Sequence, residues 1–399
     1  MMMVMKPSCR RSRPLSGLSG KQSNHSLKNF ITRDHPYVYL GGSVLAALGL
    51  YTATTQPSEL SFLGNSPLLY LPALLCLAFL ALAFVALTVK LCNWKTYRQT
   101  VFKSERMVRV ARIASYVMCA AALLLLIDRP LMHLAVIIRD SATAPRMPDG
   151  FFQSMVYMLY NGKTFFRMGV WTTVRIALLG TLIAFVLALF LVTLRIQQPD
   201  RQDNDLVRFF KAIGRNFASL YITVIRGTPM MVQALIFYYA GFGIFKSTGM
   251  TVTEINQVWS FFISGLMTVS LNSTAYLAEV LRGGIESIDH GQTEAARSLG
   301  MNSWQTMLKV VFPQAVKNSI PAIGNEFIIN IKDSSVLSVI GCMDLMYATT
   351  TVSGIYFKAL ETYCIAAVFY LILTYFSSLL MKAISRKLDT AVKEIPSSN

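Results

Sequence analysis

Residues 289–313, with the sequence DHGQTEAARSLGMNSWQTMLKVVFP, form a polar island between two strongly apolar segments. The first half predicts a short helix, which Asp289 is placed to cap and Gly300 is placed to end in a left-handed conformation. Glu294 and Arg297 lie three positions apart and predict an ion pair on the helix surface. One face of this helix carries four residues at helical spacing: Gln292, Ala295, Ala296 and Leu299.

The second half of this stretch predicts another short helix after Gly300. Asn302 or Ser303 can cap it, and Pro313 is expected to end the unit because proline disrupts a helix interior. Its apolar stripe consists of Trp304, Met307, Leu308 and Val311. From the pattern alone, the segment is either a loop that lies on the membrane surface or a compact knob that fits a partner's groove.

The spacing of residues in this stretch resembles a family signature. The tripeptide EAA at residues 294–296 precedes Gly300, and nine residues separate that glycine from the sequence VVFP at 310–313. The pattern resembles the EAA loop of ABC-importer permeases, although that family more often has Ile and Leu where this chain has Val310 and Phe312. In the family, this loop is the coupling helix that docks onto a separate ATP-hydrolysing subunit. The resemblance implies the same role for Gln292, Glu294, Ala295, Ala296, Leu299, Gly300 and Pro313.

The composition is that of a membrane protein. Of the 399 residues, 54% are hydrophobic and only 14% are charged, whereas a soluble domain carries about 25% charged residues. The formal net charge of +17 could suggest a nucleic-acid partner, but the basic residues fall into blocks between apolar spans. The positive-inside rule for membrane proteins explains that distribution better.

The apolar segments predict an all-α polytopic protein with about eight transmembrane helices. The expected spans are residues 37–55, 68–91, 110–127, 169–196, 229–245, 258–281, 316–340 and 362–384. Residues 131–138 and 151–160 are too short to span a bilayer and predict interfacial segments on the outer side. An even number of spans places both termini on one side, and the basic loops make that side the cytosol. The stretch at residues 289–313 is then cytosolic as well.

The chain predicts two membrane regions flanked by tails. Residues 1–35 are expected to be a basic cytosolic tail, residues 36–150 an accessory region with about three spans, and residues 390–399 a second cytosolic tail. The family resemblance covers only residues 151–389, which it implies are a five-helix core of the type I ABC-importer kind that contains the coupling loop 289–313. It also implies the bacterial cytoplasmic (inner) membrane as the location.

Residues 206–224 predict a basic amphipathic helix that lies in the cytosolic headgroup layer. Thr228 is placed to cap the helix that follows, with Pro229 at its first position. The run Arg226-Gly227-Thr228-Pro229 resembles the RGTP segment of the permease branch that imports polar amino acids. We expect Arg226 to contact another subunit or a lipid headgroup. The apolar face of the helix consists of Leu206, Phe209, Phe210, Ile213, Phe217, Leu220 and Val224.

The span at residues 258–281 ends in an unusually polar stretch that includes Asn272 and Tyr276. The sequences AYLAE at residues 275–279 and RGGI at 282–285 resemble the AYxAE and RGGI signatures of the same branch. Glu279 and Arg282 are three residues apart and predict a local ion pair near the cytosolic end of the helix.

Residues 320–335 predict the lining of a transport pathway. Pro321 and Gly324 loosen the helix, and its polar side chains occupy an arc of roughly 160°. An ionised group at mid-bilayer costs about 3 kcal/mol, so these groups should face protein or water. An alternative is a packing pair between Glu326 and a lysine of another span. With the two residues of the preceding span, the candidate pathway residues are Asn272, Tyr276, Asn325, Glu326 and Lys332.

The sequence offers no catalytic or metal-binding constellation. The six cysteines are scattered without a CxxC pair, and the four histidines are dispersed. Gly162-Lys163-Thr164 lacks the leading glycine of a P-loop, because Tyr157 stands at that position. We therefore expect no covalent chemistry, cofactor or metal on this chain, with ATP and Mg²⁺ bound by a partner.

The sequence is best explained as the transmembrane permease subunit of an ATP-driven importer for polar amino acids. The expected partners are a cytosolic ATPase dimer, a second permease (the same chain or a sister subunit) and an extracytoplasmic solute-binding protein. Two alternatives remain open at this point: a secondary transporter driven by an ion gradient, which would also place Glu326 and Lys332 along a pathway, and a membrane scaffold without transport.

Overall fold

A computed structural model describes residues 35–64, 66–92, 105–197 and 203–393 of the chain. The basic tail predicted at residues 1–35 lies outside the described residues except for His35, and so does most of the tail predicted at 390–399. The chain divides into two compact units, Met1–Asp140 and Ser141–Asn399. Each unit is described by itself below.

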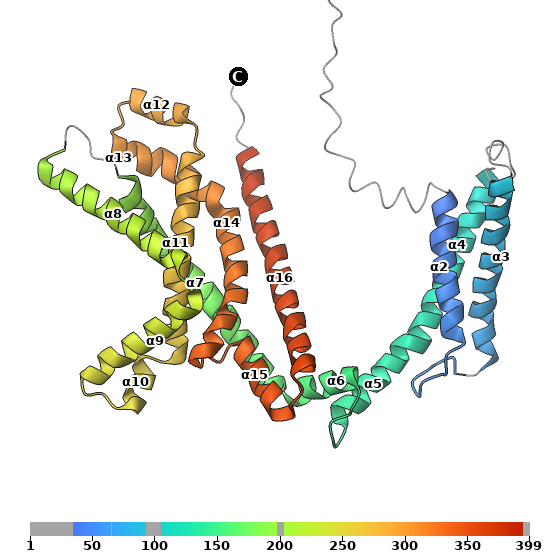
Figure 1. Ribbon diagram of the computed structural model, residues 1–399. Coiled ribbons are helices and arrows are strands. Elements are labelled where there is room, and N and C mark those ends of the chain that lie inside the picture. The colour runs from blue at the N-terminus through green and yellow to red at the C-terminus, as the bar shows by residue number, and fades with distance from the viewer. Residues whose placement is uncertain (1–34, 65, 93–104, 198–202, 394–399) are drawn as a thin grey trace, which may run out of the picture. The chain divides into compact units, whose positions relative to one another are not determined.

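The first unit is built from helices throughout its described part (Figure 1). Small side chains form its core, among them Ala46, Cys76 and Ala122, which are fully buried. A Cβ atom added to Gly49 would lie 3.2 Å from the Cα atom of Ala122, so this glycine allows α2 and α4 to approach closely. The elements of this unit are α2 (His35–Ala53), η1 (Pro67–Leu69), α3 (Tyr70–Cys92), α4 (Glu105–Leu126), the π-helical η4 (Ile127–Leu131) and the first part of α5 (Met132–Thr143).

The third span extends well beyond its predicted end at residue 127. Helices α4, η4 and α5 together form a continuous span from Arg109 to Thr143, 35 residues long. The prediction of a separate interfacial segment at residues 131–138 was therefore wrong. Asp128 and Arg129 do not mark a boundary with water, because they are 0% and 2% exposed. Pro130 is accommodated by the π-helical turn, a common device where a helix must absorb an irregularity.

Asp128 and Arg129 hold the loop between α2 and α3 against η4. The Asp128 carboxylate accepts hydrogen bonds from the backbone N–H groups of Phe62 and Leu63 at 2.8 and 2.9 Å and from the Ser61 hydroxyl at 2.8 Å. The Arg129 guanidinium donates to backbone carbonyl oxygens of the same loop at 2.7 Å. Its Nε atom lies 3.4 Å from the Asp128 carboxylate. Asp128 and Arg129 thus hold the loop in place, although the buried Arg129 Nε atom itself makes no hydrogen bond within the described residues.

The second unit is a helical bundle in which α11 packs against α7, α8, α9 and α14. Its apolar core includes Ala188, Ala275 and Leu277, all fully buried. Residues 151–160, predicted to be a short apolar segment, form α6. The elements are α6 (Phe151–Asn161), α7 (Lys163–Ile196), α8 (Asp205–Gly227), α9 (Met230–Ser247), α10 (Val252–Val258), α11 (Phe261–Glu286), α12 (His290–Ser298), α13 (Ser303–Thr306), η5 (Met307–Val311), α14 (Phe312–Asp333), η6 (Ser334–Ile340), α15 (Leu345–Tyr356) and α16 (Ala359–Lys393).

The predicted all-α polytopic fold is confirmed. Five helices of the described chain are long and apolar enough to cross a membrane. Two further candidates are bent helix pairs, α8 with α9 at 111° and the run Ser303–Ile340 with α15 at 53°. The first predicted span corresponds to a shorter apolar helix, Gly41–Ala53. In Figure 1, α12, α13 and the C-terminal end of α16 lie at one end of the second unit, and α10 and α15 lie at the other.

Replacing Asp128 by Asn should destabilise the first unit by about 3–5 kcal/mol, because Arg129 would keep a buried charge without its counter-ion. A variant that keeps Cys76 as its only cysteine permits the measurement, since Cys76 is 0% exposed and becomes reactive to a thiol dye only on unfolding. Asp140→Asn is the matched control, because Asp140 pairs with Arg139 at the exposed surface. Equal labelling midpoints for the two variants would contradict the role assigned to Asp128.

Candidate functional site

Helix α12 is capped at both ends as the sequence predicted. The Asp289 carboxylate accepts a hydrogen bond from the backbone N–H of Gly291 at 2.6 Å. At the other end Gly300 has φ +82°, and the N–H groups of Gly300 and Met301 donate to Arg297 and Ala296 at 3.0 and 3.2 Å. This pair of bonds is a Schellman motif, which requires the left-handed conformation that glycine adopts without strain.

Helix α13 begins immediately after this turn, with Asn302 as its cap. The Asn302 side chain accepts from the backbone N–H of Gln305 at 2.8 Å, and the Gln305 side chain accepts from the N–H of Asn302 at 3.1 Å. This is a complete capping box, and it selects Asn302 over Ser303. Both helix starts and the turn between them are therefore fixed locally. We refer to residues 289–313 as the coupling knob.

The predicted apolar stripe of α12 divides between two environments. Ala296 is 4% exposed and faces the rest of the chain, whereas Leu299 is 81% exposed. Gln292 and Ala295 are exposed too, so the described part of the chain leaves three of these four residues uncovered. The predicted Glu294–Arg297 ion pair does not form. Arg297 donates instead to the Ser303 hydroxyl at 3.1 Å, because the turn at Gly300 brings α13 beside the end of α12.

Pro313 does not end the second helix of the knob, contrary to the prediction. It lies in the first turn of α14, and Ser303–Asp333 runs without a break through α13, η5 and α14. The π-helical turn at Met307–Val311 precedes the proline and relieves the clash that it would cause in a regular helix. The knob is therefore continuous with a membrane helix.

Glu279 lies where the ends of α7, α8 and α11 meet. Its carboxylate accepts a hydrogen bond from Arg282 at 2.8 Å, which confirms the predicted pair. It also accepts from Arg195, and the Arg226 guanidinium lies 3.8 Å away. Arg226 is stacked over the Tyr276 ring at 5.3 Å from its centroid. Sequence reasoning missed Arg195, since nothing in a single sequence relates the end of α7 to a residue 84 positions later.

Thr228 does not cap α9 as predicted. The N-cap position is taken by Pro229, and the Thr228 hydroxyl donates back to the carbonyl of Val224 in α8 at 3.0 Å. The same hydroxyl accepts a hydrogen bond from the Gln233 amide at 2.8 Å. Thr228 thus supports the sharp bend between α8 and α9. Arg226 and Gly227 belong to the end of α8.

Buried polar side chains join four helices of the second unit. Asn272 on α11 donates to Gln233 on α9 at 2.9 Å. The Asn330 side chain on α14 accepts from Ser273 on α11 at 2.9 Å and donates to Thr181 on α7 at 2.8 Å. Gln233 and Thr181 were not predicted, because their partners on α11 and α14 lie far away in the sequence. The sequence could indicate only that each polar group in a membrane helix needs a hydrogen-bond partner, without identifying that partner.

The predicted pathway residues of α14 fall on two faces. Glu326 is 7% exposed and lies on the same side as Asn330, which is 2% exposed. Asn325 and Lys332 are exposed on the opposite side. The alternative pairing of Glu326 with a lysine does not form, since no base of the described chain lies within ion-pair distance of it. Tyr276 is 37% exposed, and Asn272 is 8% exposed.

Comparisons with known proteins place the chain among transport proteins of the membrane. Residues 206–390 match the family described as "Binding-protein-dependent transport system inner membrane component". The glutamine transport system permease protein GlnP of Escherichia coli (strain K12) is 35% identical over 176 residues, 44% of this chain and 76% of that protein. The putative GlnP of Rickettsia prowazekii (strain Madrid E) is 31% identical over 236 residues, 59% of this chain and 98% of that protein.

The chain therefore belongs to the family of binding-protein-dependent transport system inner membrane components. Within that family it is a permease subunit of the ABC-transporter class, a multi-pass membrane protein with a transport role rather than an enzymatic one. A crystal structure of an amino acid ABC transporter with histidines has a chain that is 33% identical to this one. The match has a TM-score of 0.49 and covers 60% of this chain and 100% of that chain.

Replacing Asn330 by Leu should cost about 1–2 kcal/mol, because the Ser273 and Thr181 hydroxyls would lose their partner on α14. The thermal midpoint can be followed in a variant with Cys342 as its only cysteine, since Cys342 is 1% exposed and reports unfolding of this unit. Asn325→Leu removes the same group from the exposed face of the same helix. A midpoint that falls equally in both variants would show that the network does not join the helices.

Proposed function

We propose that this chain carries polar amino acids into the cell, as a permease that forms the pathway and is driven by a cytosolic ATPase dimer. The observation that supports ATP coupling most directly is the uncovered row of Gln292, Ala295 and Leu299 on α12. An 81% exposed leucine on a helix held rigid at both ends is an anchor for a partner's groove. Because the coupling knob is continuous with α14, movement of that partner is passed to the membrane helices.

A second permease, either the same chain or a sister subunit, is supported by the exposed face of α14. Lys332 and Asn325 lie on the outside of this chain's own bundle. Lys332 lies in the last turn of α14, where a lysine that faces hydrocarbon costs up to about 3 kcal/mol. A second bundle placed against this face, around a water-filled pathway, would relieve that cost.

The substrate class is supported by the family relatives and by the polar groups of the bundle. The matched relatives are described as glutamine transport permeases. In this chain Glu326, Asn272 and Tyr276 offer a carboxylate, an amide and a phenol, groups that suit the ammonium and polar atoms of a zwitterionic amino acid. A solute-binding protein on the outer side would deliver the substrate.

The proposed mechanism is a rigid-body rotation. ATP and Mg²⁺ bind to the ATPase pair, which closes and moves the coupling knob, and the attached helices open the pathway outward. The knob and both termini are then cytosolic. Figure 1 supports this for the second unit, where the end of α16 lies at the same end as α12.

Uptake by inside-loaded vesicles separates this proposal from its alternatives. Uptake of a labelled polar amino acid should require internal ATP and external binding protein, and an ion gradient without ATP should not sustain it. Gradient-driven uptake without ATP would establish the secondary-transporter alternative. An ATPase should copurify with the wild-type chain but not with Glu294→Lys or Gly300→Asp. That result would exclude a scaffold that binds no ATPase.

Gly300→Val should abolish ATP-driven uptake while the protein still inserts, because a β-branched residue cannot adopt φ +82° without strain. The cost is about 1–3 kcal/mol at this turn, enough to disorder the start of α13. Gly354→Val is the control, since a side chain there meets no atom within 4 Å and the backbone has an ordinary helical φ. Uptake at the wild-type rate by the Gly300→Val protein would contradict a role of this turn in ATP coupling.

Glu326→Ala should alter the concentration dependence or rate of amino acid uptake without loss of ATPase binding. The Glu326 side chain is buried yet has no ionic partner in the described chain, so its carboxyl group is available to a substrate. Competition among amino acids that carry a positive, neutral or negative side chain should change order in Glu326→Gln. An uptake curve identical to that of wild type for both variants would leave Glu326 with a packing role alone.

A further inference from the structure

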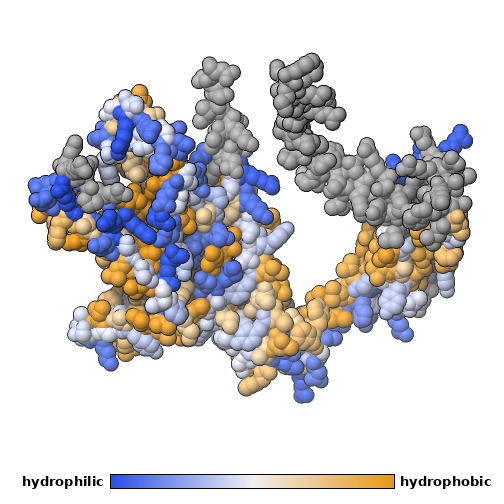
Figure 2. All heavy atoms as spheres, turned by 45° about the horizontal axis from the view of Figure 1, so that its top comes forward, coloured by the Kyte–Doolittle hydropathy of each residue, from blue (hydrophilic) through white to orange (hydrophobic). Residues whose placement is uncertain are grey.

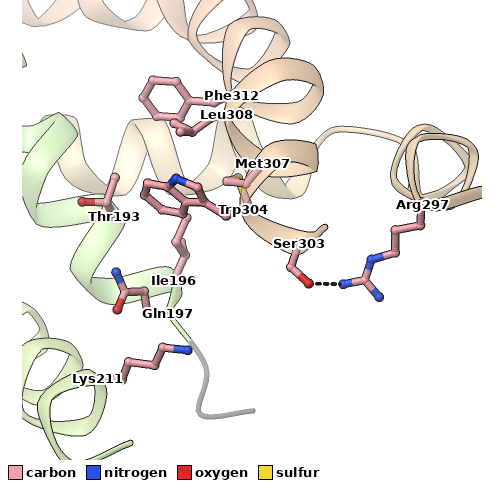
Figure 3. A pocket seen from close by; sticks show the side chains of 10 residues that line it. All are labelled: Thr193, Ile196, Gln197, Lys211, Arg297, Ser303, Trp304, Met307, Leu308 and Phe312. Atoms are coloured by element: carbon pink, nitrogen blue, oxygen red, sulfur yellow. Dashed lines mark hydrogen bonds between the residues drawn. The ribbon is translucent and has the colours of Figure 1, made fainter. Parts of the chain in front are cut away.

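A cavity of about 530 Å³ separates the coupling knob from the ends of α7 and α8. Its volume lies within the range of roughly 300–1,000 Å³ of typical small-molecule sites. One part of its wall is apolar and is formed by Ile196, Trp304, Met307, Leu308 and Phe312. The other part of the wall is polar and includes Thr193 on α7 and Gln197, the C-cap residue of that helix (Figure 3). The cavity is therefore amphipathic, and none of the steps described above uses it.

Two basic side chains stand on either side of this cavity. Lys211 projects from α8 and Arg297 from α12, and they lie on opposite sides of the view in Figure 3. Lys211 is paired with Asp203 at 2.6 Å. Arg297 contacts only the Ser303 hydroxyl, and no carboxylate of the described chain lies within ion-pair distance of it. The rim thus carries one uncompensated positive charge, which suits an anionic ligand.

The cavity lies on the face of α12 opposite the uncovered row. At 100° per residue, Arg297 is about 160° around the helix from Ala295 and from Leu299. A partner that covers Leu299 therefore leaves the cavity side of the helix free. A ligand there would contact the knob from the membrane side and would not compete with an ATPase.

The surroundings of the cavity place it at the depth of lipid headgroups. Helix α8 turns a row of large apolar side chains outward, for example Leu206, Phe210 and Leu220, which are 65%, 63% and 64% exposed. A helix with such a row and a basic opposite face lies in the membrane interface. Trp304 is 57% exposed at the cavity, and tryptophan is enriched at this depth. Figure 2 shows hydrophilic and apolar surface side by side around this end of the second unit.

We propose that this cavity binds the headgroup of an anionic phospholipid, with the phosphate at Arg297 and the upper acyl chains against Trp304, Leu308 and Phe312. The amphipathic wall excludes a purely ionic ligand, and the net positive rim favours an anionic lipid over a zwitterionic one. The bound lipid ties the knob to the inner leaflet. This inference rests on the cytosolic placement of the knob in the proposed function.

Native mass spectrometry of the full-length chain in detergent tests the binding directly. Wild type should retain dioleoyl-phosphatidylglycerol in preference to dioleoyl-phosphatidylcholine. Arg297→Gln should weaken phosphatidylglycerol binding about five-fold, as expected for one surface charge near an anionic lipid. Arg215→Gln removes the same charge from an exposed position of α8 outside the cavity and should leave the binding unchanged.

A second pair of measurements identifies the source of the phosphate. Millimolar inorganic phosphate should not displace the lipid, because free phosphate lacks the acyl chains that contribute to binding. Trp304→Ala should weaken phosphatidylglycerol binding, because it removes a side chain that contacts those acyl chains. Equal retention of the two lipids, or equal losses for Arg297→Gln and Arg215→Gln, would overturn the proposal. Displacement by free phosphate would overturn it in favour of a soluble anion. Lipid binding is measured without ATPase or transport, so its outcome is separate from that of the uptake assay.

Discussion

The side-chain amide of Asn330 is the contact on which the arrangement of the second unit depends. It accepts from Ser273 on α11 and donates to Thr181 on α7, so one residue of α14 fixes the relation of three helices. In a bilayer no water can replace these partners, and each group must be satisfied by protein. The hydrogen bonds therefore specify which faces of the helices meet, where apolar packing alone would allow several rotations.

Two of those helices lead directly to the coupling knob. α14 reaches it through η5 without a break, and only residues 287–289 separate α11 from α12. At the same end, the carboxylate of Glu279 joins α11 to arginines of α7 and α8. The knob, the bend at Thr228 and the buried network consequently belong to one mechanical assembly. In the proposed mechanism, a displacement of the knob is passed through these continuous helices to the polar groups around Glu326.

Features fixed by local rules could be predicted from the sequence. The caps at Asp289 and Asn302 and the left-handed turn at Gly300 follow from a few neighbouring residues, and apolar length located the spans. Features that depend on distant partners could not. The third span was predicted to end at residue 127 because two charged residues, Asp128 and Arg129, follow. The sequence could not reveal that their hydrogen-bond partners lie more than 60 positions earlier. Pro313 looked like a helix end because the π-helical turn that accommodates it leaves no pattern in the sequence. The contacts of Arg195, Gln233 and Thr181 were missed for the same reason.

The exposed face of α14 also affects the stability of the protein between its insertion into the membrane and its assembly. Asn325 and Lys332 are exposed on the single chain, so in the proposed function they stay uncovered until a second permease binds. A lysine in contact with hydrocarbon raises the free energy of the single folded chain. Binding of a second bundle, entry of water into the bilayer or unfolding would each lower that free energy. If a second permease covers this face as proposed, copies made in excess of it should be degraded by membrane proteases, and degradation as well as synthesis would set the ratio of the subunits.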